Sequence, residues 1–249
     1  MHFTSDTVTD GIREQLFTLG EIPGVLWTPA DATGARPLVL IGHGGGSNKK
    51  GWEVTSRAVP LVSTCGFAVA SIDAPGTGDR PLHPEVKRLV ALIDGRMETG
   101  EPIEAAQREM SDTVAAELIP DWQATLDELQ SLAYVGSSEP VGYYGLSQGG
   151  ELGIRFVAEE PRISAAVLGL IGYPWLAEPA SRISVPVEFL LQWDDVSNPR
   201  EAVMELFDAL GSAEKTLHAN PGGHFRIPPF EIESAVRFFA RHLGTAPQG

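Results

Sequence analysis

The amino-acid sequence predicts an α/β fold, in which a mostly parallel central sheet carries helices on both faces. Short apolar runs recur along the chain, and segments with helical periodicity lie between them. Continuous apolar runs are typical of parallel strands, because such strands are buried on both faces. The length of 249 residues suits one domain of this class. We therefore expect a single domain over residues 1–249.

The predicted strands follow one another along the chain. Two short ones, over 13–19 and 24–27, are separated by a turn that ends at Pro23. The apolar run over 38–41 is the first strand that we expect to be parallel. Similar runs predict strands at 67–72, 141–146, 165–171 and 187–191, and residues 215–219 are strand-like.

Helices are predicted where apolar residues recur at intervals of three and four. Such stripes extend over 122–133, 203–210 and 232–243. Each lies after a predicted strand, so crossover connections would place the helices against the sheet.

Residues 81–120 interrupt this alternation. They contain no strand pattern, and two apolar stripes, over 86–93 and 103–118, predict a pair of helices with Gly95 and Gly100 between them. Excursions at the carboxyl edge of a parallel sheet often cover binding clefts. We expect residues 81–120 to form a helical cap, with an ordinary packed connection as the alternative.

Charge and cysteine content exclude several classes of partner and site. The chain has 18 basic and 33 acidic residues, a formal net charge of −15, which argues against a nucleic-acid surface. Cys65 is the only cysteine, so neither an intramolecular disulfide nor a cysteine zinc site is expected.

The hydropathy pattern argues against insertion in a membrane. Residues 1–11 are polar and acidic, unlike a signal peptide, and no apolar run reaches the about 18 residues of a membrane span. We expect a cytoplasmic protein with no membrane partner. The sequence leaves its oligomeric state open.

Gly145-Leu-Ser147-Gln-Gly149 carries the strongest chemical signal. It fits the pattern G-x-S-x-G and lies between a predicted strand and a helical segment. At so sharp a turn the serine hydroxyl is exposed above the sheet, and the glycines avoid the clashes that a Cβ would cause. Ser147 is therefore the candidate nucleophile.

A serine nucleophile needs a base, and the base needs an orienting acid. Of six histidines, His224 is best placed, since it follows a glycine-rich loop after the last predicted strand. The acid should follow the strand at 187–191, where Asp194 and Asp195 are adjacent. Spacing alone does not choose between them.

With Ser, Asp and His in this order, residues 13–243 resemble the α/β-hydrolase family, and within it the small bacterial esterases of the dienelactone-hydrolase kind. The family's G-x-x-D pattern favours Asp195, although Gln192 stands where that pattern has glycine. Dienelactone hydrolases proper carry a cysteine at the position of Ser147, so the resemblance concerns the fold and machinery and not that substrate.

The resemblance also implies an oxyanion hole. Glycines follow His43 directly after the strand at 38–41, and they let backbone N–H groups approach a substrate oxygen. By resemblance, the two donors are the N–H groups of Gly45 and Gln148. We interpret His43 as an anchor of this loop. The turn that begins at Asp73 resembles the family's D-x-P-G-x-G turn and is interpreted as structural.

Together these patterns predict a serine hydrolase that cleaves carboxylic esters of small molecules through an acyl-enzyme, with no cofactor or metal. Trp175 and Met97 are candidate pocket residues, with simple packing as the alternative role. A thioesterase, an amidase or an acyltransferase would use the same three residues. A ligand-binding member of the fold without turnover is the alternative outside enzymes.

Overall fold

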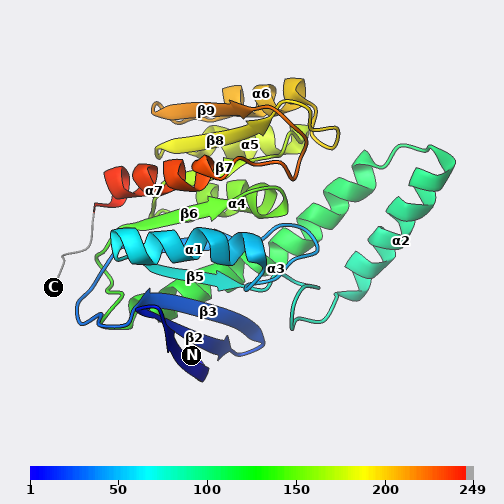
Figure 1. The fold of residues 1–249 in the computed structure, drawn as a ribbon. Coiled ribbons are helices and arrows are strands. Elements are labelled where there is room, and N and C mark those ends of the chain that lie inside the picture. The colour runs from blue at the N-terminus through cyan, green and yellow to red at the C-terminus, as the bar shows by residue number, and fades with distance from the viewer. Residues whose placement is uncertain (245–249) are drawn as a thin grey trace.

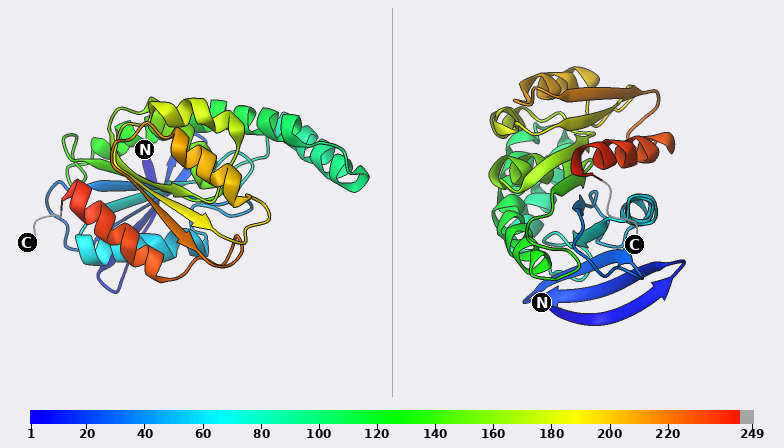
Figure 2. Two further views of the ribbon diagram at one scale, coloured as in Figure 1. Left: turned by 90° about the horizontal axis from the view of Figure 1, so that it is seen from above. Right: turned by 90° about the vertical axis from the view of Figure 1, so that its left-hand side faces the viewer.

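The structure, a computed structural model, describes residues 1–244 as a single open sheet between two layers of helices (Figures 1 and 2). The strand order is β1-β2-β3-β5-β4-β6-β7-β8-β9, antiparallel from β1 to β5 and parallel beyond. The prediction of a mostly parallel sheet is confirmed. The strands are β1 (His2–Thr9), β2 (Ile12–Leu19), β3 (Ile22–Pro29), β4 (Leu38–Gly42), β5 (Ala68–Ile72), β6 (Val141–Gly145), β7 (Ile163–Gly169), β8 (Val187–Gln192) and β9 (Lys215–Asn220).

Helices cover both faces of the sheet, and each face has its own apolar core. One face carries α1 and α7, and the other carries α3 to α6 (Figure 2). The helices on the sheet are α1 (Trp52–Cys65), α3 (Glu104–Gln130), α4 (Gln148–Glu159), α5 (Ala177–Arg182), α6 (Arg200–Ala209) and α7 (Phe230–Leu243), with the 3₁₀ turn η1 (Pro174–Leu176) before α5.

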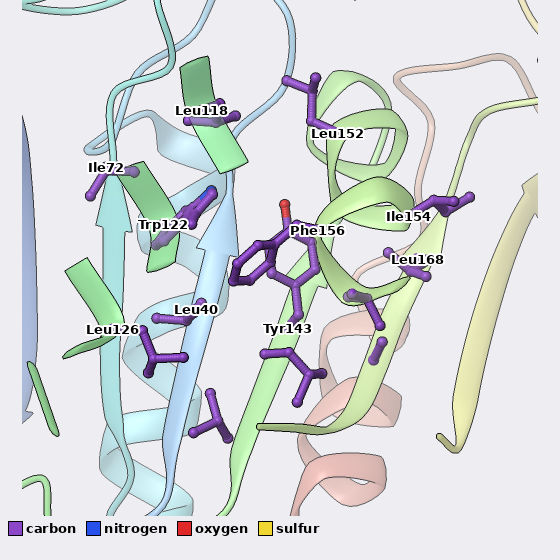
Figure 3. Packing of buried hydrophobic residues seen from close by; sticks show 14 of the residues in the cluster. Leu40, Ile72, Leu118, Trp122, Leu126, Tyr143, Leu152, Ile154, Phe156 and Leu168 are labelled. Carbon is purple, nitrogen blue, oxygen red and sulfur yellow. The ribbon is translucent and has the colours of Figure 1, made fainter. Parts of the chain in front are cut away.

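An aromatic cluster joins three elements behind the carboxyl end of β6 (Figure 3). The Tyr143 ring lies 6.3 Å from that of Trp122 on α3 and 5.6 Å from that of Phe156 on α4. The Tyr143 hydroxyl donates to the carbonyl oxygen of Gly149 at 2.8 Å, and burial raises the pKa of this phenol. The cluster therefore fixes the start of α4 against β6.

The first strand was not predicted. β1 pairs antiparallel with β2 at the edge of the sheet, and most of its residues are exposed. An edge strand forms backbone hydrogen bonds on one side and needs little apolar content, so the polar sequence of residues 2–9 gives no hydropathy signal.

The region expected to form a cap contains α2 (Pro84–Thr99) and the first part of α3. The two helices pack on each other and project beyond the carboxyl edge of the sheet (Figure 1). α3 continues through Pro120 to Gln130, so the stripes at 103–118 and from 122 onwards belong to one helix. No helix among residues 1–244 has the length and apolarity to cross a bilayer.

Candidate active site

Ser147 occupies a strained turn between β6 and α4. Its φ of 58° and ψ of −126° lie in a region that residues with a side chain rarely adopt. The Ser147 N–H donates to the Gly169 carbonyl of β7 at 3.0 Å, and its carbonyl accepts from the Glu151 N–H at 2.8 Å. These two hydrogen bonds hold the turn and leave the side chain at the sheet's carboxyl edge.

Glycine is required on both sides of this serine. A Cβ at Gly145 would lie 2.1 Å from the Gly149 carbonyl oxygen, and one at Gly149 would lie 2.3 Å from the Gly42 carbonyl oxygen. Real Cβ atoms do not approach backbone this closely, so only glycine lets α4 begin directly against β4 and β6.

His224 reaches Ser147 from the loop between β9 and α7. Its Nε2 lies 2.9 Å from Ser147 Oγ, and its Nδ1 lies 2.6 Å from Asp195 Oδ2. With the ring proton on Nδ1, the imidazole donates to the carboxylate and presents the lone pair of Nε2 to the serine hydroxyl. The structure thus brings together three residues that are far apart in the sequence.

The two adjacent aspartates after β8 have different partners. Asp195 is buried, and its Oδ1 accepts from the N–H groups of Ser197 at 2.8 Å and Asn198 at 3.2 Å. Asp194 is exposed, and its Oδ2 accepts from the Gly222 N–H at 3.0 Å. Asp195 therefore contacts the imidazole of His224, whereas Asp194 contacts the loop that carries this residue.

Gly45 lies beside the first residue of α4. A Cβ built on Gly45 would be 3.8 Å from Gln148 Oε1, in ordinary contact. Within residues 1–244 no acceptor pairs with the Gly45 N–H. Gln148 begins α4, and the N–H groups of a first helical turn have no partner inside the helix. Two backbone donors are thus available beside Ser147.

A buried network holds the loop that contains Gly45. The Ala74 N–H donates to His43 Nε2 at 3.1 Å, so the ring proton is on Nδ1, which lies 2.9 Å from the Gly44 carbonyl oxygen. Asp73 is fully buried and accepts from both the backbone N–H and the ammonium group of Lys49, each at 2.7 Å. These contacts fasten the loop after β4 to the turn after β5.

The two candidate pocket residues lie in different surroundings. Trp175 is half-buried in η1 and stacks on Tyr173 with ring centroids 4.5 Å apart. Burial, with the nearby charges of Glu151 and Asp195, raises the pKa of Tyr173 to about 12. Met97 is 63% exposed near the end of α2 and belongs to neither core cluster. The structure therefore places only Trp175 close to the groups around Ser147.

A small apolar cavity lies behind the Ser147 turn, between β4, β6 and α3. Neither Trp175 nor Met97 borders it. The residues that line it include Gly42, His43, Ile72, Leu118, Trp122 and Leu152.

Two polar residues near the site were assigned no role from the sequence. The Gln192 side-chain amide donates to the Gly223 carbonyl at 3.3 Å, next to His224. Glu151, on the first turn of α4, is half-buried, and this burial raises the pKa of its carboxyl group. Gln192 could have been noticed because it is a polar residue at the end of an apolar strand. No sequence pattern indicated Glu151.

One further group of side chains has the composition of a metal site. Glu188, His218 and Glu231 converge between β8, β9 and α7.

The chain was compared with family models, with curated proteins and with solved structures, and only the solved structures match it. No family model matches it, and no curated protein does. Among solved structures, a cold-adapted esterase from an Arctic intertidal metagenomic library is 31% identical, with 98% of this chain and 100% of that chain covered and a TM-score of 0.80.

Two more distant structures share the fold. An acetyl xylan esterase from Paenibacillus sp. R4 is 18% identical, covering 97% of this chain and 88% of its own, with a TM-score of 0.69. A dienelactone hydrolase from Anabaena variabilis is 20% identical, covering 96% and 98%, with a TM-score of 0.64.

Proposed function

Since this chain belongs to the α/β-hydrolase family and is a carboxylic ester hydrolase, we propose that Ser147, His224 and Asp195 carry out its reaction through an acyl-enzyme. The observation that supports this most is the continuous chain of contacts from Asp195 through His224 to a serine on a strained turn. A histidine that served only to pack the loop would not need one ring nitrogen at a buried carboxylate and the other at a serine hydroxyl.

In the acylation step, Ser147 Oγ attacks the ester carbonyl while His224 Nε2 takes the hydroxyl proton. The buried carboxylate of Asp195 stabilises the imidazolium that forms. His224 then gives this proton to the departing alkoxide, and the ester C–O bond breaks to leave acyl-Ser147 and an alcohol.

In the deacylation step, water replaces the alcohol. His224 Nε2 takes a proton from the water as the water oxygen attacks the acyl carbonyl. The bond between the acyl carbon and Ser147 Oγ then breaks, and His224 gives that proton to Oγ. The products are the carboxylic acid and the free hydroxyl. The His224 imidazole acts first as a base and then as an acid in both steps.

The N–H groups of Gly45 and Gln148 serve as the oxyanion hole in both steps. Negative charge builds on the carbonyl oxygen in each transition state, and preformed backbone donors stabilise it. His43, Asp73 and Lys49 act indirectly, because they fix the loop that contains Gly45.

The helical pair α2 and α3 would serve as a cap over the substrate, which we propose to be a small-molecule ester in the cytoplasm. Its support is the projection of the pair from the edge where β6, β8 and β9 end (Figure 1). Trp175 would line the pocket. The acidic surface favours neither nucleic acid nor an anionic membrane as a partner.

Steady-state kinetics on matched acetyl ester, thioester and anilide substrates tests the proposal. The native enzyme should turn over the ester fastest, and Ser147→Ala should lower kcat by about 10⁴-fold or more, as expected for loss of a nucleophile. Ester hydrolysis that persists in Ser147→Ala would refute it. Faster turnover of the thioester or the anilide would reassign the substrate class.

A further inference from the structure

Three ionisable side chains outside the proposed triad converge between the sheet and α7. Glu188 comes from β8, His218 from β9 and Glu231 from α7, and one ligand-capable atom of each lies within 4.8 Å of the other two. His218 Nδ1 is 2.8 Å from Glu231 Oε2, and its Nε2 is 3.6 Å from Glu188 Oε2.

This cluster holds more negative charge than its partners neutralise. The side chains of Glu188 and Glu231 are only 5% and 3% exposed. Within residues 1–244 no lysine or arginine forms an ion pair with either carboxylate, although the charge of Arg237 acts on Glu188 from a greater distance. A single imidazole, that of His218, lies between the two carboxylates. Burial of an unpaired carboxylate is costly, so the site favours an added positive charge.

Two features of Glu188 indicate a missing partner. Its Oε1 is buried and accepts no hydrogen bond from the residues that the structure describes. Its Oε2 accepts from Ser234 Oγ at 3.0 Å, but is too far from His218 Nε2 for a hydrogen bond. Two ligands of a tetrahedral ion, each about 2.1 Å from the metal, lie about 3.4 Å apart, close to this separation.

Glu231 is placed to orient the imidazole. A histidine that binds a metal through one ring nitrogen usually donates its other N–H to a carboxylate, which fixes its tautomer and rotation. His218 Nδ1 and Glu231 Oε2 have this relation, and the Asn220 amide donates to Glu231 Oε1 at 2.8 Å. The His218 side chain is 27% exposed, so the cluster lies near the surface of the protein.

We propose that His218 Nε2 and the Glu188 carboxylate bind a divalent transition-metal ion of the Zn²⁺ type, with Glu231 orienting His218. Imidazole with carboxylate suits Zn²⁺ better than Mg²⁺ or Ca²⁺, which prefer all-oxygen sites. His218 and Asn220 precede the loop that carries His224, and Glu231 follows it. The ion therefore fastens the base of this loop, apart from the atoms that react.

Isothermal titration with Zn²⁺ on chelator-treated protein tests the proposal without an activity readout. The titration uses the His224→Asn background, because the triad imidazole is itself a possible ligand. We expect one Zn²⁺ per chain and a rise in Tm with Zn²⁺ concentration. Adding Glu188→Gln or His218→Asn should abolish both effects, and adding Glu231→Gln should weaken binding about 10- to 100-fold.

His242→Asn is the matched control. His242 lies on α7 and has a carboxylate neighbour, Glu214, 3.7 Å away, but is outside the cluster, so its loss should leave the Zn²⁺ affinity unchanged. Absence of a Zn²⁺ site in the His224→Asn background would overturn the proposal, as would equal affinities in the His218→Asn and His242→Asn variants.

A crystal of the full chain soaked in Zn²⁺ covers the case in which a cluster variant does not fold. An anomalous peak between His218 Nε2 and the Glu188 carboxylate supports the proposal, and Zn²⁺ bound only elsewhere refutes it. These readouts are independent of the proposed esterase mechanism.

Discussion

Ser147 combines a reactive hydroxyl with a backbone conformation that its side chain disfavours. The positive φ costs of the order of 1–3 kcal/mol and persists because the hydrogen bonds at both ends of the turn impose it. The strain has a use, since it lifts Oγ out of the helix and towards His224. At Ser147 the backbone strain lowers the stability of the fold and positions the hydroxyl near His224.

Ser147→Gly should therefore be more stable than Ser147→Ala, although both lack the nucleophile. Glycine adopts the required φ without strain, whereas alanine keeps the Cβ that causes it. In urea unfolding, the free energy of unfolding of Ser147→Gly should exceed that of Ser147→Ala by about 1 kcal/mol. Equal midpoints would show that the turn is not strained.

Asp195→Asn and Asp194→Asn separate two neighbours with different roles. The first should lower kcat/KM by about 10³- to 10⁴-fold, because an amide beside Nδ1 favours the wrong imidazole tautomer. The second keeps an acceptor for the Gly222 N–H and should change kcat/KM by less than about tenfold. Similar losses in the two variants would contradict the assignment of Asp195 as the orienting acid.

At the scale of elements, the site depends on how closely α4 approaches the strands beside it. Gly149 allows contact with the carbonyl oxygen of Gly42, and the aromatic cluster of Trp122, Tyr143 and Phe156 holds the helix from behind. The N-terminus of α4 is thereby fixed relative to the loop of Gly45. A shift of this helix would separate the two proposed oxyanion donors.

Gly149→Ala should destabilise the fold by about 3 kcal/mol or more, because the new Cβ would overlap backbone that has no room to move. Gly95→Ala on α2 is the matched control. A Cβ there meets nothing within 4 Å, so replacing a helical glycine should stabilise by about 0.5–1 kcal/mol. Thermal unfolding of both variants measures the difference, and a tolerated Gly149→Ala would refute the close approach.

The carboxyl group of Glu151 makes the stability of α4 depend on pH. Burial raises the pKa of Glu151 above its ordinary value, although Ser111 and Arg155 favour the charged form. The folded protein therefore binds the proton of Glu151 more tightly than the unfolded chain does. The resulting contribution to the free energy of unfolding is complete below the ordinary pKa of the carboxyl group, and it is lost as pH rises through the raised pKa.

Glu151→Gln removes this dependence. Measured from pH 4 to pH 8, the native protein should lose stability relative to Glu151→Gln, by about 1.4 kcal/mol for each unit by which the pKa is raised. Parallel pH profiles for the two proteins would contradict the raised pKa.

At the scale of the molecule, most of the architecture was predictable because parallel strands are buried on both faces and their apolar runs are visible. The strand over 38–41 is one example, and the helix stripe that ends at Leu243 is another. β1 was missed because an exposed edge strand needs no apolar pattern. The continuous α3 was missed because Pro120 is tolerated inside it.

The sequence was less informative about contacts than about elements. Ser147 and His224 were indicated by glycine-rich turns at strand ends. Spacing alone did not choose between Asp194 and Asp195, and the family pattern favoured Asp195, whose contact with His224 is seen only in the structure. Glu188 lies inside the apolar run of β8, where a charged residue is unusual. Its partners come from β9 and α7, so spacing gave no indication of the cluster.

Covalent labelling with a fluorophosphonate probe tests the central claim most directly. The native protein should gain one probe per chain, located on Ser147 by mass spectrometry of its peptides, and His224→Asn should slow the labelling about 10³-fold or more because the hydroxyl loses its base. Labelling at another residue, or an unchanged rate in His224→Asn, would contradict the claim that the contact between Ser147 and His224 activates the nucleophile.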